Sequence, residues 1–184
     1  MGFHKVELDT DKWSWHPSPL VGQIVLVTTV DGEGAENVST KSWVSMAAFN
    51  PPVLSFGCNL QHRTAKNVLA TGDFVVNVPG SDLVEKAWEI ADLPPPRSLD
   101  RVGLTGLPAI KVRPRRIAEC RAHFECSLDS WKAWGEEVTL FGRMVSFSMD
   151  EEMLEGDSLD RYERLGLSVY LEDRTYGVVK AHKI

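Results

Sequence analysis

The sequence predicts a mainly β fold, an all-β barrel with a few flanking helices. Three observations support this: several short runs rich in β-branched and aromatic residues, turn residues between the runs, and only two or three segments with helical spacing. The 184 residues are 43% hydrophobic and 25% charged, an ordinary composition that can bury a core. We therefore expect one domain over residues 1–184, and the composition excludes disordered and fibrous classes.

The first predicted elements form a hairpin followed by a third strand. Val21–Val30 is apolar and β-branched on both faces, which is typical of a strand buried on both sides. Asp31-Gly32-Glu33-Gly34 follows, and its Asp-Gly pair supplies the positive φ of a tight turn. Ala35–Val44 should therefore return antiparallel to the first strand. Val53–Cys58 should form the third strand. In the preceding Asn50-Pro51-Pro52 the two prolines lack amide donors, which suits the beginning or edge of a strand.

Two helices with a strand between them are expected next. Thr64–Ala70 has helical spacing, and Gly72 stands where a left-handed C-terminal cap belongs. Phe74–Val78 alternates as a strand does. Asp82 should begin the second helix, with Glu85 in the capping-box position, and this helix should end before three consecutive prolines.

The second half of the chain predicts a long hairpin and a tail. Asp92–Pro114 is rich in Pro, Gly and charge without a sustained period, which is typical of a lid or a subunit contact. Ile117–Leu128 and Glu137–Met149 have strand-like composition and are separated by a segment with two tryptophans. From Asp150 the tail is acidic at first, and its two last apolar runs should form a short strand or a docking segment.

Charge and cysteine content exclude several classes of protein. The net charge of −6 at pH 7 disfavours nucleic acid as a partner. The longest purely aliphatic stretch, Ile24–Val27, is far shorter than the roughly 20 apolar residues of a membrane span. Met1–Asp9 mixes acids and bases, and no apolar signal-peptide core follows it. Three cysteines suit thiols in a reducing compartment. We expect a cytoplasmic protein with no membrane and no nucleic acid as partner.

The most tempting metal pattern is Cys120-x-x-His123-x-x-Cys126. On a strand, His123 would point away from both cysteines, which would lie about 20 Å apart at about 3.3 Å per residue. We therefore expect no metal site. The sequence also lacks a Gly-x-Ser-x-Gly elbow, a His-Glu-x-x-His helix, a Walker loop and a Gly-x-Gly-x-x-Gly turn.

Basic residues and tryptophans allow both structural and binding interpretations. A solvated strand edge is favoured over phosphate binding for the basic run, which lacks interleaved aromatic residues. Trp88, on the apolar face of a helix, is expected to pack in the core, whereas Trp43 stays a candidate for stacking on a ligand ring. The basic run consists of Lys111, Arg113, Arg115, Arg116 and Arg121.

The segment Cys58–Asn67 joins a strand directly to a helix start. Free amides at that start, the Thr64 hydroxyl and the cations Arg63 and Lys66 could hold a phosphate. The alternative is an ordinary capped helix with solvated charges, and local chemistry alone favours it because helix starts are common.

A succession of short segments carries a family resemblance. In order, they are Leu26–Gly32, Asn37–Trp43, Asn50-Pro51-Pro52, His62–Asn67, Thr71–Val78, Val102–Thr105, Phe124-Glu125-Cys126 and Leu140–Val145. In order and spacing this succession resembles the flavin reductase-like, FMN-binding split-barrel family, over about residues 19–150. The resemblance implies a Greek-key FMN-binding split β-barrel with a few flanking helices. The tail, 151–184, would dock on the barrel or on a partner subunit.

The same resemblance implies a homodimer that holds FMN in a groove near the subunit interface. The phosphate would contact Arg63 and Thr64 and the helix start. The segment Ser39–Ser45 would run past the ribityl chain and ring, and Cys58–Gln61 would close the other side. The implied cofactor-binding residues are Asn37, Ser39, Thr40, Lys41, Ser42, Trp43, Val44, Ser45, Cys58, Asn59, Leu60, Gln61, His62, Arg63, Thr64, Lys66 and Asn67.

The resemblance further implies an FMN-dependent NAD(P)H oxidoreductase of the flavin reductase type. A hydride would pass from nicotinamide C4 to flavin N5, and then electrons to free flavin, a partner oxygenase or another small acceptor. Such a protein positions two rings and needs no nucleophile or general base. Two alternatives stay open: a non-catalytic FMN-binding electron carrier reduced by a protein partner, and a small β-barrel without flavin.

Overall fold

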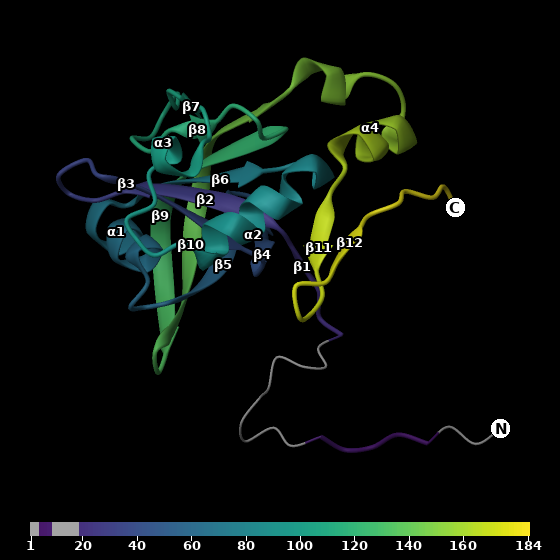
Figure 1. The fold of residues 1–184 in the computed structure, drawn as a ribbon, viewed down its shortest axis with the longest axis horizontal. Coiled ribbons are helices and arrows are strands. Elements are labelled where there is room, and N and C mark those ends of the chain that lie inside the picture. The colour runs from purple at the N-terminus through teal and green to yellow at the C-terminus, as the bar shows by residue number, and fades with distance from the viewer. Residues whose placement is uncertain (1–3, 9–18) are drawn as a thin grey trace.

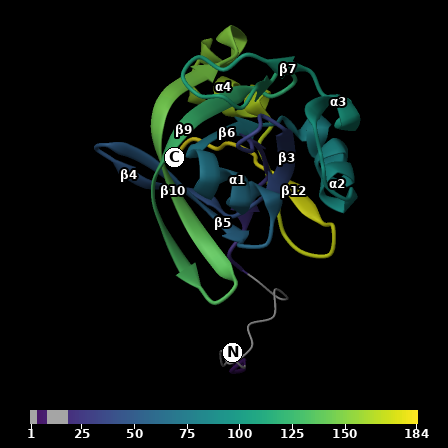
Figure 2. The same cartoon turned by 90° about the vertical axis from the view of Figure 1, so that its left-hand side faces the viewer.

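The computed structural model describes residues 4–8 and 19–184 (Figure 1), so part of the Met1–Asp9 segment, on which the expected absence of a signal peptide rests, lies outside the described residues. Seven strands form one antiparallel sheet in the order β3-β2-β6-β9-β10-β5-β4. The sheet curves into a barrel-like body with β3 and β4 at its two edges, and α2 (Val84–Asp92) and α3 (Leu99–Val102) lie on its outside (Figure 2). The seven strands are β2 (Val25–Val30), β3 (Glu36–Lys41), β4 (Val44–Phe49), β5 (Pro52–Asn59), β6 (Asp73–Val78), β9 (Ala122–Trp134) and β10 (Glu137–Met149).

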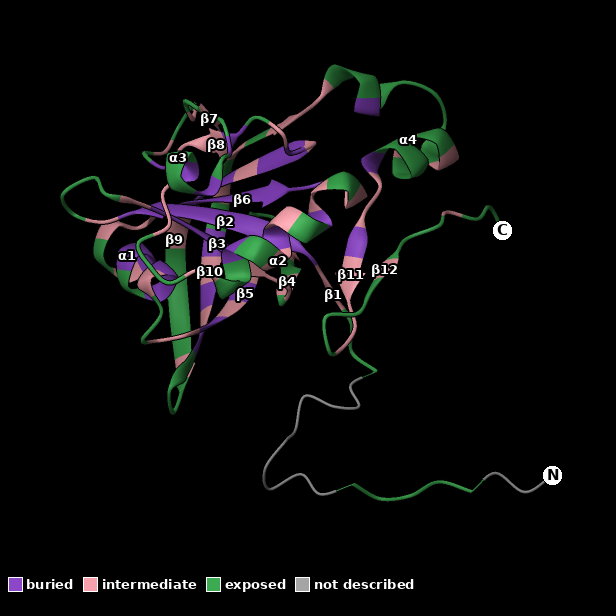
Figure 3. Cartoon of the chain, in the orientation of Figure 1, coloured by how far each residue is buried: buried purple, intermediate pink, exposed green. Residues whose placement is uncertain are grey.

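The predicted β2–β3 hairpin is confirmed. Every residue of β2 is buried, and Figure 3 shows this strand running through the middle of the protein. The Asp31 carboxylate closes the turn by accepting the backbone N–H groups of Glu33 at 3.0 Å and Ala35 at 2.8 Å. The return strand is shorter than predicted, because it ends at Lys41 and not at Val44.

The separate strand β4 was not predicted. Its first residue, Val44, pairs with Phe56 of β5, and the Gly57 N–H donates to the Trp43 carbonyl at 3.0 Å. After Lys41 the chain therefore stops pairing with β2 and crosses to the other edge of the sheet. The third predicted strand is confirmed as β5, which begins at Pro52.

Helix α1 (Arg63–Thr71) and its cap are confirmed. Gly72 adopts φ 79°, which is left-handed and favours glycine, and its N–H donates to the Val68 carbonyl at 2.8 Å. Ala65 and Val68 are fully buried in the hydrophobic core that the strands of the main sheet also line. This packing fixes the direction of the helix start.

The start of the second helix differs from the prediction. A 3-10 turn over Ser81–Leu83 precedes α2 (Val84–Asp92), and no side chain caps either element, so the expected capping box does not form. The Leu83 N–H instead bonds the Gly80 carbonyl at 3.1 Å. Helix α2 buries Val84, Ala87 and Ile90 in a second core cluster beside β3.

The irregular segment after α2 is fastened to the barrel. It contains α3 (Leu99–Val102) and the short paired strands β7 (Gly106–Leu107) and β8 (Arg116–Ile117). The Val38 N–H of edge strand β3 donates to the Arg97 carbonyl at 2.7 Å. The segment therefore extends the β3 edge.

The predicted long hairpin is confirmed as β9 and β10. The expected break over residues 129–136 is wrong: β9 continues to Trp134, and the turn falls at Gly135, which has φ 61°. Trp131 and Trp134 are consequently exposed strand residues, with 53% and 59% of their surface accessible. The hairpin extends past the rest of the sheet (Figures 1 and 2).

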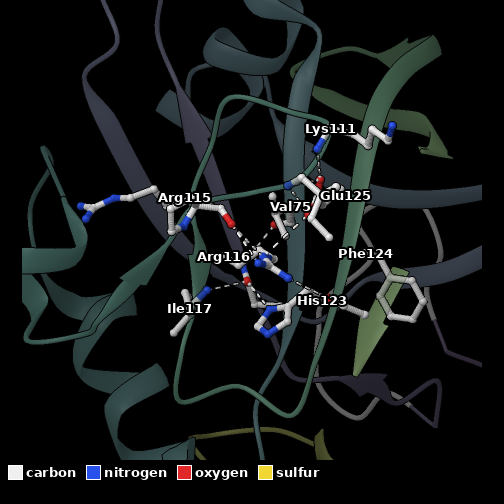
Figure 4. Close-up of polar contacts among 12 residues, drawn as sticks. Val75, Lys111, Arg115, Arg116, Ile117, His123, Phe124 and Glu125 are labelled. Atoms are coloured by element: carbon white, nitrogen blue, oxygen red, sulfur yellow. Dashed lines mark hydrogen bonds and ion pairs between the residues drawn. The ribbon is translucent and has the colours of Figure 1, made fainter. Parts of the chain in front are cut away.

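A buried polar network joins this hairpin to the preceding strands (Figure 4). The side-chain oxygen Oδ1 of Asn77 accepts the Ile117 N–H at 3.0 Å and lies 3.0 Å from His123 Nδ1. The side-chain amide of Asn77 donates to the Leu26 carbonyl. Burial lowers the pKa of His123 to about 4. His123 thus has a structural partner, and among residues 4–8 and 19–184 no three or more His, Cys, Asp or Glu side chains gather as a metal site.

The basic run is ion-paired, so the predicted solvated strand edge is wrong for most of it. Arg115 binds Glu36 at 2.6 Å, and Arg116 lies 3.8 Å from the fully buried Glu125. The Glu125 carboxylate also accepts the backbone N–H groups of Ile110 at 2.9 Å and Lys111 at 2.6 Å. The remaining ion pairs are Arg113 with Asp73 and Arg121 with Asp82.

The tail returns to the start of the barrel. After a 3-10 turn (Glu151–Leu154) and α4 (Ser158–Leu165), strands β11 (Ser168–Tyr170) and β12 (Tyr176–Val178) pair in one sheet with β1 (Gly22–Gln23). The expected last strand is therefore confirmed and is one of two. No helix of the described chain is long and apolar enough to cross a membrane.

Candidate functional site

Three adjoining cavities follow the end of β3. The first, of about 370 Å³, lies between β3, the start of α1 and the loop after α2. It shares Thr40, Lys41 and His62 with a second cavity of about 200 Å³. The second shares Ser42, Trp43 and Gly57 with a third of about 500 Å³. Together they form a groove from the helix start to the edge of β4.

Hydroxyl and amide groups line the floor of the first cavity. The Thr64 hydroxyl, in the first turn of α1, lies 2.7 Å from the Ser39 hydroxyl and accepts from the Asn37 amide at 3.3 Å. The Asn37 side-chain oxygen Oδ1 is buried and has no hydrogen-bond partner among the described residues. Alternate residues of β3 thus present their side chains to the helix start.

Arg63 stands at the same end of the groove. Its Nη2 donates to the Asp31 carboxylate at 2.8 Å, whereas its Nε is buried with no hydrogen-bond partner in the described part of the chain. The Ala35 N–H, then the Glu33 N–H and the Arg63 guanidinium, hold the pKa of Asp31 below its usual range. Asp31 therefore binds one nitrogen of the guanidinium, and the Nε group is left for another acceptor such as an anion.

Lys41, Cys58 and His62 meet at the middle of the groove. Burial lowers the pKa of the Lys41 ammonium and raises that of the Cys58 thiol, and the charge of each group offsets part of the shift of the other. Cys58 Sγ lies 3.7 Å from His62 Nδ1. Burial, and then the Lys41 charge, lower the pKa of His62. The middle of the groove therefore favours a negatively charged or carbonyl-bearing ligand.

The far end of the groove offers an aromatic surface. The Trp43 ring lies against Gly57, where an added Cβ would come within 2.7 Å of ring atom Cε3. Only glycine fits there without displacing the indole. Since Trp43 is half exposed at the edge of the third cavity, it can contact a flat ring that enters the groove.

The structure brings most of the predicted site residues together. Leu60 packs against the core, Lys66 is exposed on α1, and the buried Asn67 amide donates to the Thr29 hydroxyl at 3.0 Å. These three do not line the groove. Those that line it are Asn37, Ser39, Thr40, Lys41, Ser42, Trp43, Val44, Ser45, Cys58, Asn59, Gln61, His62, Arg63 and Thr64.

The sequence analysis missed Arg97, which lines the first cavity with Pro95 and Ala91. Nothing local marks it, because it stands in an irregular proline-rich segment. Its position depends on the long-range bond between its carbonyl and the Val38 N–H. Glu137 in the second cavity was missed for a similar reason, since only the β10–β5 register places it beside Asn59.

In chemical terms the groove suits a ligand that carries both a phosphate and a flat ring. A phosphate needs cations and donors, which Arg63, Thr64 and the start of α1 supply. A flat ring needs an apolar aromatic wall with a few polar groups, and the part of the groove near Trp43 and Ser45 supplies one.

Curated relatives cover most of the chain. A protein of Pyrococcus abyssi, PYRAB12460, is 28% identical over 69% of this chain and 74% of its own. YwrF of Bacillus subtilis is 32% identical over 73% of this chain and 71% of its own. Both relatives are named as uncharacterized.

Solved structures share the fold. Nitrilotriacetate monooxygenase component B of Bacillus cereus superposes with a TM-score of 0.88 at 21% identity and 100% coverage of both chains. A Shewanella frigidimarina structure, titled as a flavin reductase with a split barrel domain, has a TM-score of 0.81 at 17% identity over 89% and 85%. Flavoredoxin of Desulfovibrio vulgaris has 0.81 at 19% identity over 94% and 96%.

The fold is thus the split β-barrel that the sequence predicts. A family model described as flavin reductase like domain matches residues 18–174. This match supports an oxidoreductase that works with a flavin. The chain belongs to the flavin reductase-like family.

Proposed function

We propose that this protein is an FMN-binding oxidoreductase of the flavin reductase type that takes a hydride from NAD(P)H. The observation that carries the proposal is the groove that joins the half-paired Arg63 to the half-exposed Trp43. Bound flavin would supply the acceptor for a hydride and then donate electrons onward. Family membership supports this reaction class.

The residues at the helix start would bind the FMN phosphate. Arg63 and Thr64 line the same cavity, and the first turn of α1 adds backbone N–H groups. Asp31 would keep the guanidinium in place before the ligand arrives, which reduces the ordering cost of binding.

The middle of the groove would bind the polar part of the cofactor. The Lys41 ammonium, desolvated beside Cys58, would stabilise negative charge that develops on the ligand during reduction. Trp43 would contact the ring, and the open third cavity beside it leaves room for a second ring. The chain would act by orienting the rings and excluding water, so the reaction needs no general base from the protein.

The acceptor and the assembly are part of the proposal. Component B of nitrilotriacetate monooxygenase shares the fold, which suggests free flavin or a partner oxygenase as electron acceptor. A homodimer is proposed because large apolar side chains are exposed on three strands of the main sheet, the adjacent β9 and β10 and the edge strand β4. These are Met46 and Phe49 of β4, Trp131 and Trp134 of β9, and Val145 and Phe147 of β10. A cytoplasmic location remains a prediction from the sequence.

A non-catalytic electron carrier is the alternative function. Flavoredoxin of Desulfovibrio vulgaris has the same fold, and an electron carrier would use the same groove. The carrier differs in one respect, because its flavin is reduced by a protein partner.

An anaerobic spectrum tests the proposal. The purified protein, saturated with FMN, is mixed with NADH or NADPH without oxygen, and absorbance of oxidised flavin is followed. Rapid bleaching at a rate well above that of free FMN is expected. Colour that persists until a protein reductant is added would favour the carrier. A colourless protein that fails to bind added FMN would overturn both functions.

A further inference from the structure

The first cavity holds more positive charge than one phosphate needs. Lys41, Arg63 and Arg97 line it together with His62, and in the described part of the chain no carboxylate does. Asp31 neutralises Arg63 from outside the cavity. Lys41 and Arg97 repel each other, since the Arg97 charge adds to burial in lowering the pKa of Lys41. Two cations thus face the cavity beyond the proposed FMN phosphate site.

Arg97 is held rigidly over the cavity. Its carbonyl accepts the Val38 N–H at 2.7 Å, and its Nε donates to the Leu93 carbonyl at 2.6 Å. Its Nη2 donates to the Ala91 carbonyl at 3.3 Å. No carboxylate pairs with its guanidinium among residues 4–8 and 19–184. A cation that carbonyl groups alone hold in place is suited to an anionic ligand.

An aromatic cavity of about 160 Å³ adjoins the charged one and shares Thr40, Lys41 and Ala91 with it. Its mainly apolar wall includes Trp88 of α2 and Tyr170 of β11, whose rings meet edge to face at 5.5 Å. The Trp88 indole nitrogen is buried and has no hydrogen-bond partner among the described residues. A buried N–H donor without an acceptor is costly unless a ligand supplies one.

We propose that these two cavities bind an adenosine diphosphate moiety. The phosphoryl groups would lie between Arg97 and Lys41. The purine would enter the aromatic cavity, where the Trp88 N–H can donate to a ring nitrogen. The inference rests on the proposed function, because it assigns the Arg63 end of the first cavity to the phosphate of FMN. NAD(P)H and FAD both carry this moiety, so either can be the source.

The test titrates ADP into the full-length protein saturated with FMN, by isothermal calorimetry. Arg97→Ala should weaken ADP binding about tenfold or more, because it removes a charge-assisted contact. Trp88→Phe should weaken it about fivefold and leave pyrophosphate binding unchanged, since it removes one N–H and keeps a ring. Lys86→Ala is the matched control, because Lys86 is a cation of α2 that pairs with Glu89 and lines neither cavity. The affinity of the Lys86→Ala protein for ADP should stay within about twofold of that of the unmodified protein.

Competition distinguishes the sources. NAD⁺ should displace ADP and leave FMN bound if the moiety comes from a nicotinamide dinucleotide. FAD should displace both ADP and FMN if the moiety belongs to the flavin.

The proposal fails if FMN binds and ADP does not, or if ADP affinity is the same in the Arg97→Ala, Trp88→Phe and Lys86→Ala proteins. Should Arg97→Ala fail to fold by circular dichroism, Arg97→Lys is used, with a weaker loss expected because Lys keeps the charge and loses the fork. Absence of FMN binding with Arg97-dependent ADP binding would overturn the proposed flavin function alone.

Discussion

Arg63 divides its guanidinium between two tasks. One nitrogen is bound to Asp31 at 2.8 Å, and another, Nε, is buried without a partner in the described chain. Exposed ion pairs of this kind stabilise proteins by only about 0–1 kcal/mol. The pair therefore serves to orient the arginine more than to stabilise the fold.

Replacing Arg63 by Ala is expected to weaken FMN binding by about 1.5–3 kcal/mol, because a charge-assisted contact to the phosphate is lost. Fluorescence titration measures the dissociation constant, and the unfolding temperature should change little. Riboflavin, which lacks the phosphate, is the matched ligand, and its affinity should be unaffected. An FMN affinity equal to that of the unmodified protein would refute the phosphate assignment.

Sequence reasoning finds a residue when its chemistry is visible locally. Arg63 and Thr64 stand at a helix start that follows a strand, so their proximity to helix amides is readable. Lys66 and Asn67 share that segment, yet helix geometry turns them away from the groove. Arg97 was missed because its place depends on a backbone bond to Val38, 59 positions earlier in the chain.

At the scale of elements, one buried carboxylate fixes a loop to the sheet. Glu125 of β9 has only 1% of its surface exposed and accepts the N–H groups of Ile110 and Lys111. Arg116 of β8 lies 3.8 Å from the same carboxylate. The path of the loop before β8 is thus fixed by contacts with β9, a strand that follows the loop in the sequence (Figure 4).

Glu125→Ala should lower the free energy of unfolding by about 3–5 kcal/mol, because it removes the charge partner of Arg116 and leaves two part-buried amides without their acceptor. Glu119→Ala is the control, since Glu119 also accepts a loop amide, that of Thr105 at 2.9 Å, in an exposed setting. The control should cost about 1 kcal/mol or less. Urea denaturation measures both, and equal losses would contradict the role of burial.

Elements that local turn chemistry defines were predicted well. Asp31-Gly32 predicts the turn of the β2–β3 hairpin, and Gly72 predicts the end of α1, without knowledge of any tertiary contact. Strand β4 was missed because Ser45, Ala47 and Ala48 give weak strand propensity. Its existence depends on pairing with β5 at the sheet edge.

On the scale of the whole molecule, the strands leave several large apolar side chains uncovered. Phe49 is 82% exposed, and Phe147 is 52% exposed although it stacks on Phe124 at 4.7 Å. Single exposed apolar residues are ordinary, but six on three strands of one sheet favour association with a second copy.

We expect a solution mass of twice 20.5 kDa by analytical ultracentrifugation. Phe49→Lys should shift the protein toward a monomer by placing a charge in the proposed interface. Ile110→Lys is the control, because Ile110 is also 60% exposed but lies on the loop before β8. A monomeric mass for the unmodified protein would contradict the homodimer.

The pairing of β1 with β11 also bears on the order in which the site is made during synthesis. Gly22 and Gln23 are synthesised before every strand of the main sheet, whereas their partners Val169 and Tyr170 follow the last of those strands. Until then the wall of the aromatic cavity opposite Trp88 is missing. A nascent chain can therefore assemble its main sheet first, and that cavity becomes a closed receptor only when translation has passed Tyr170.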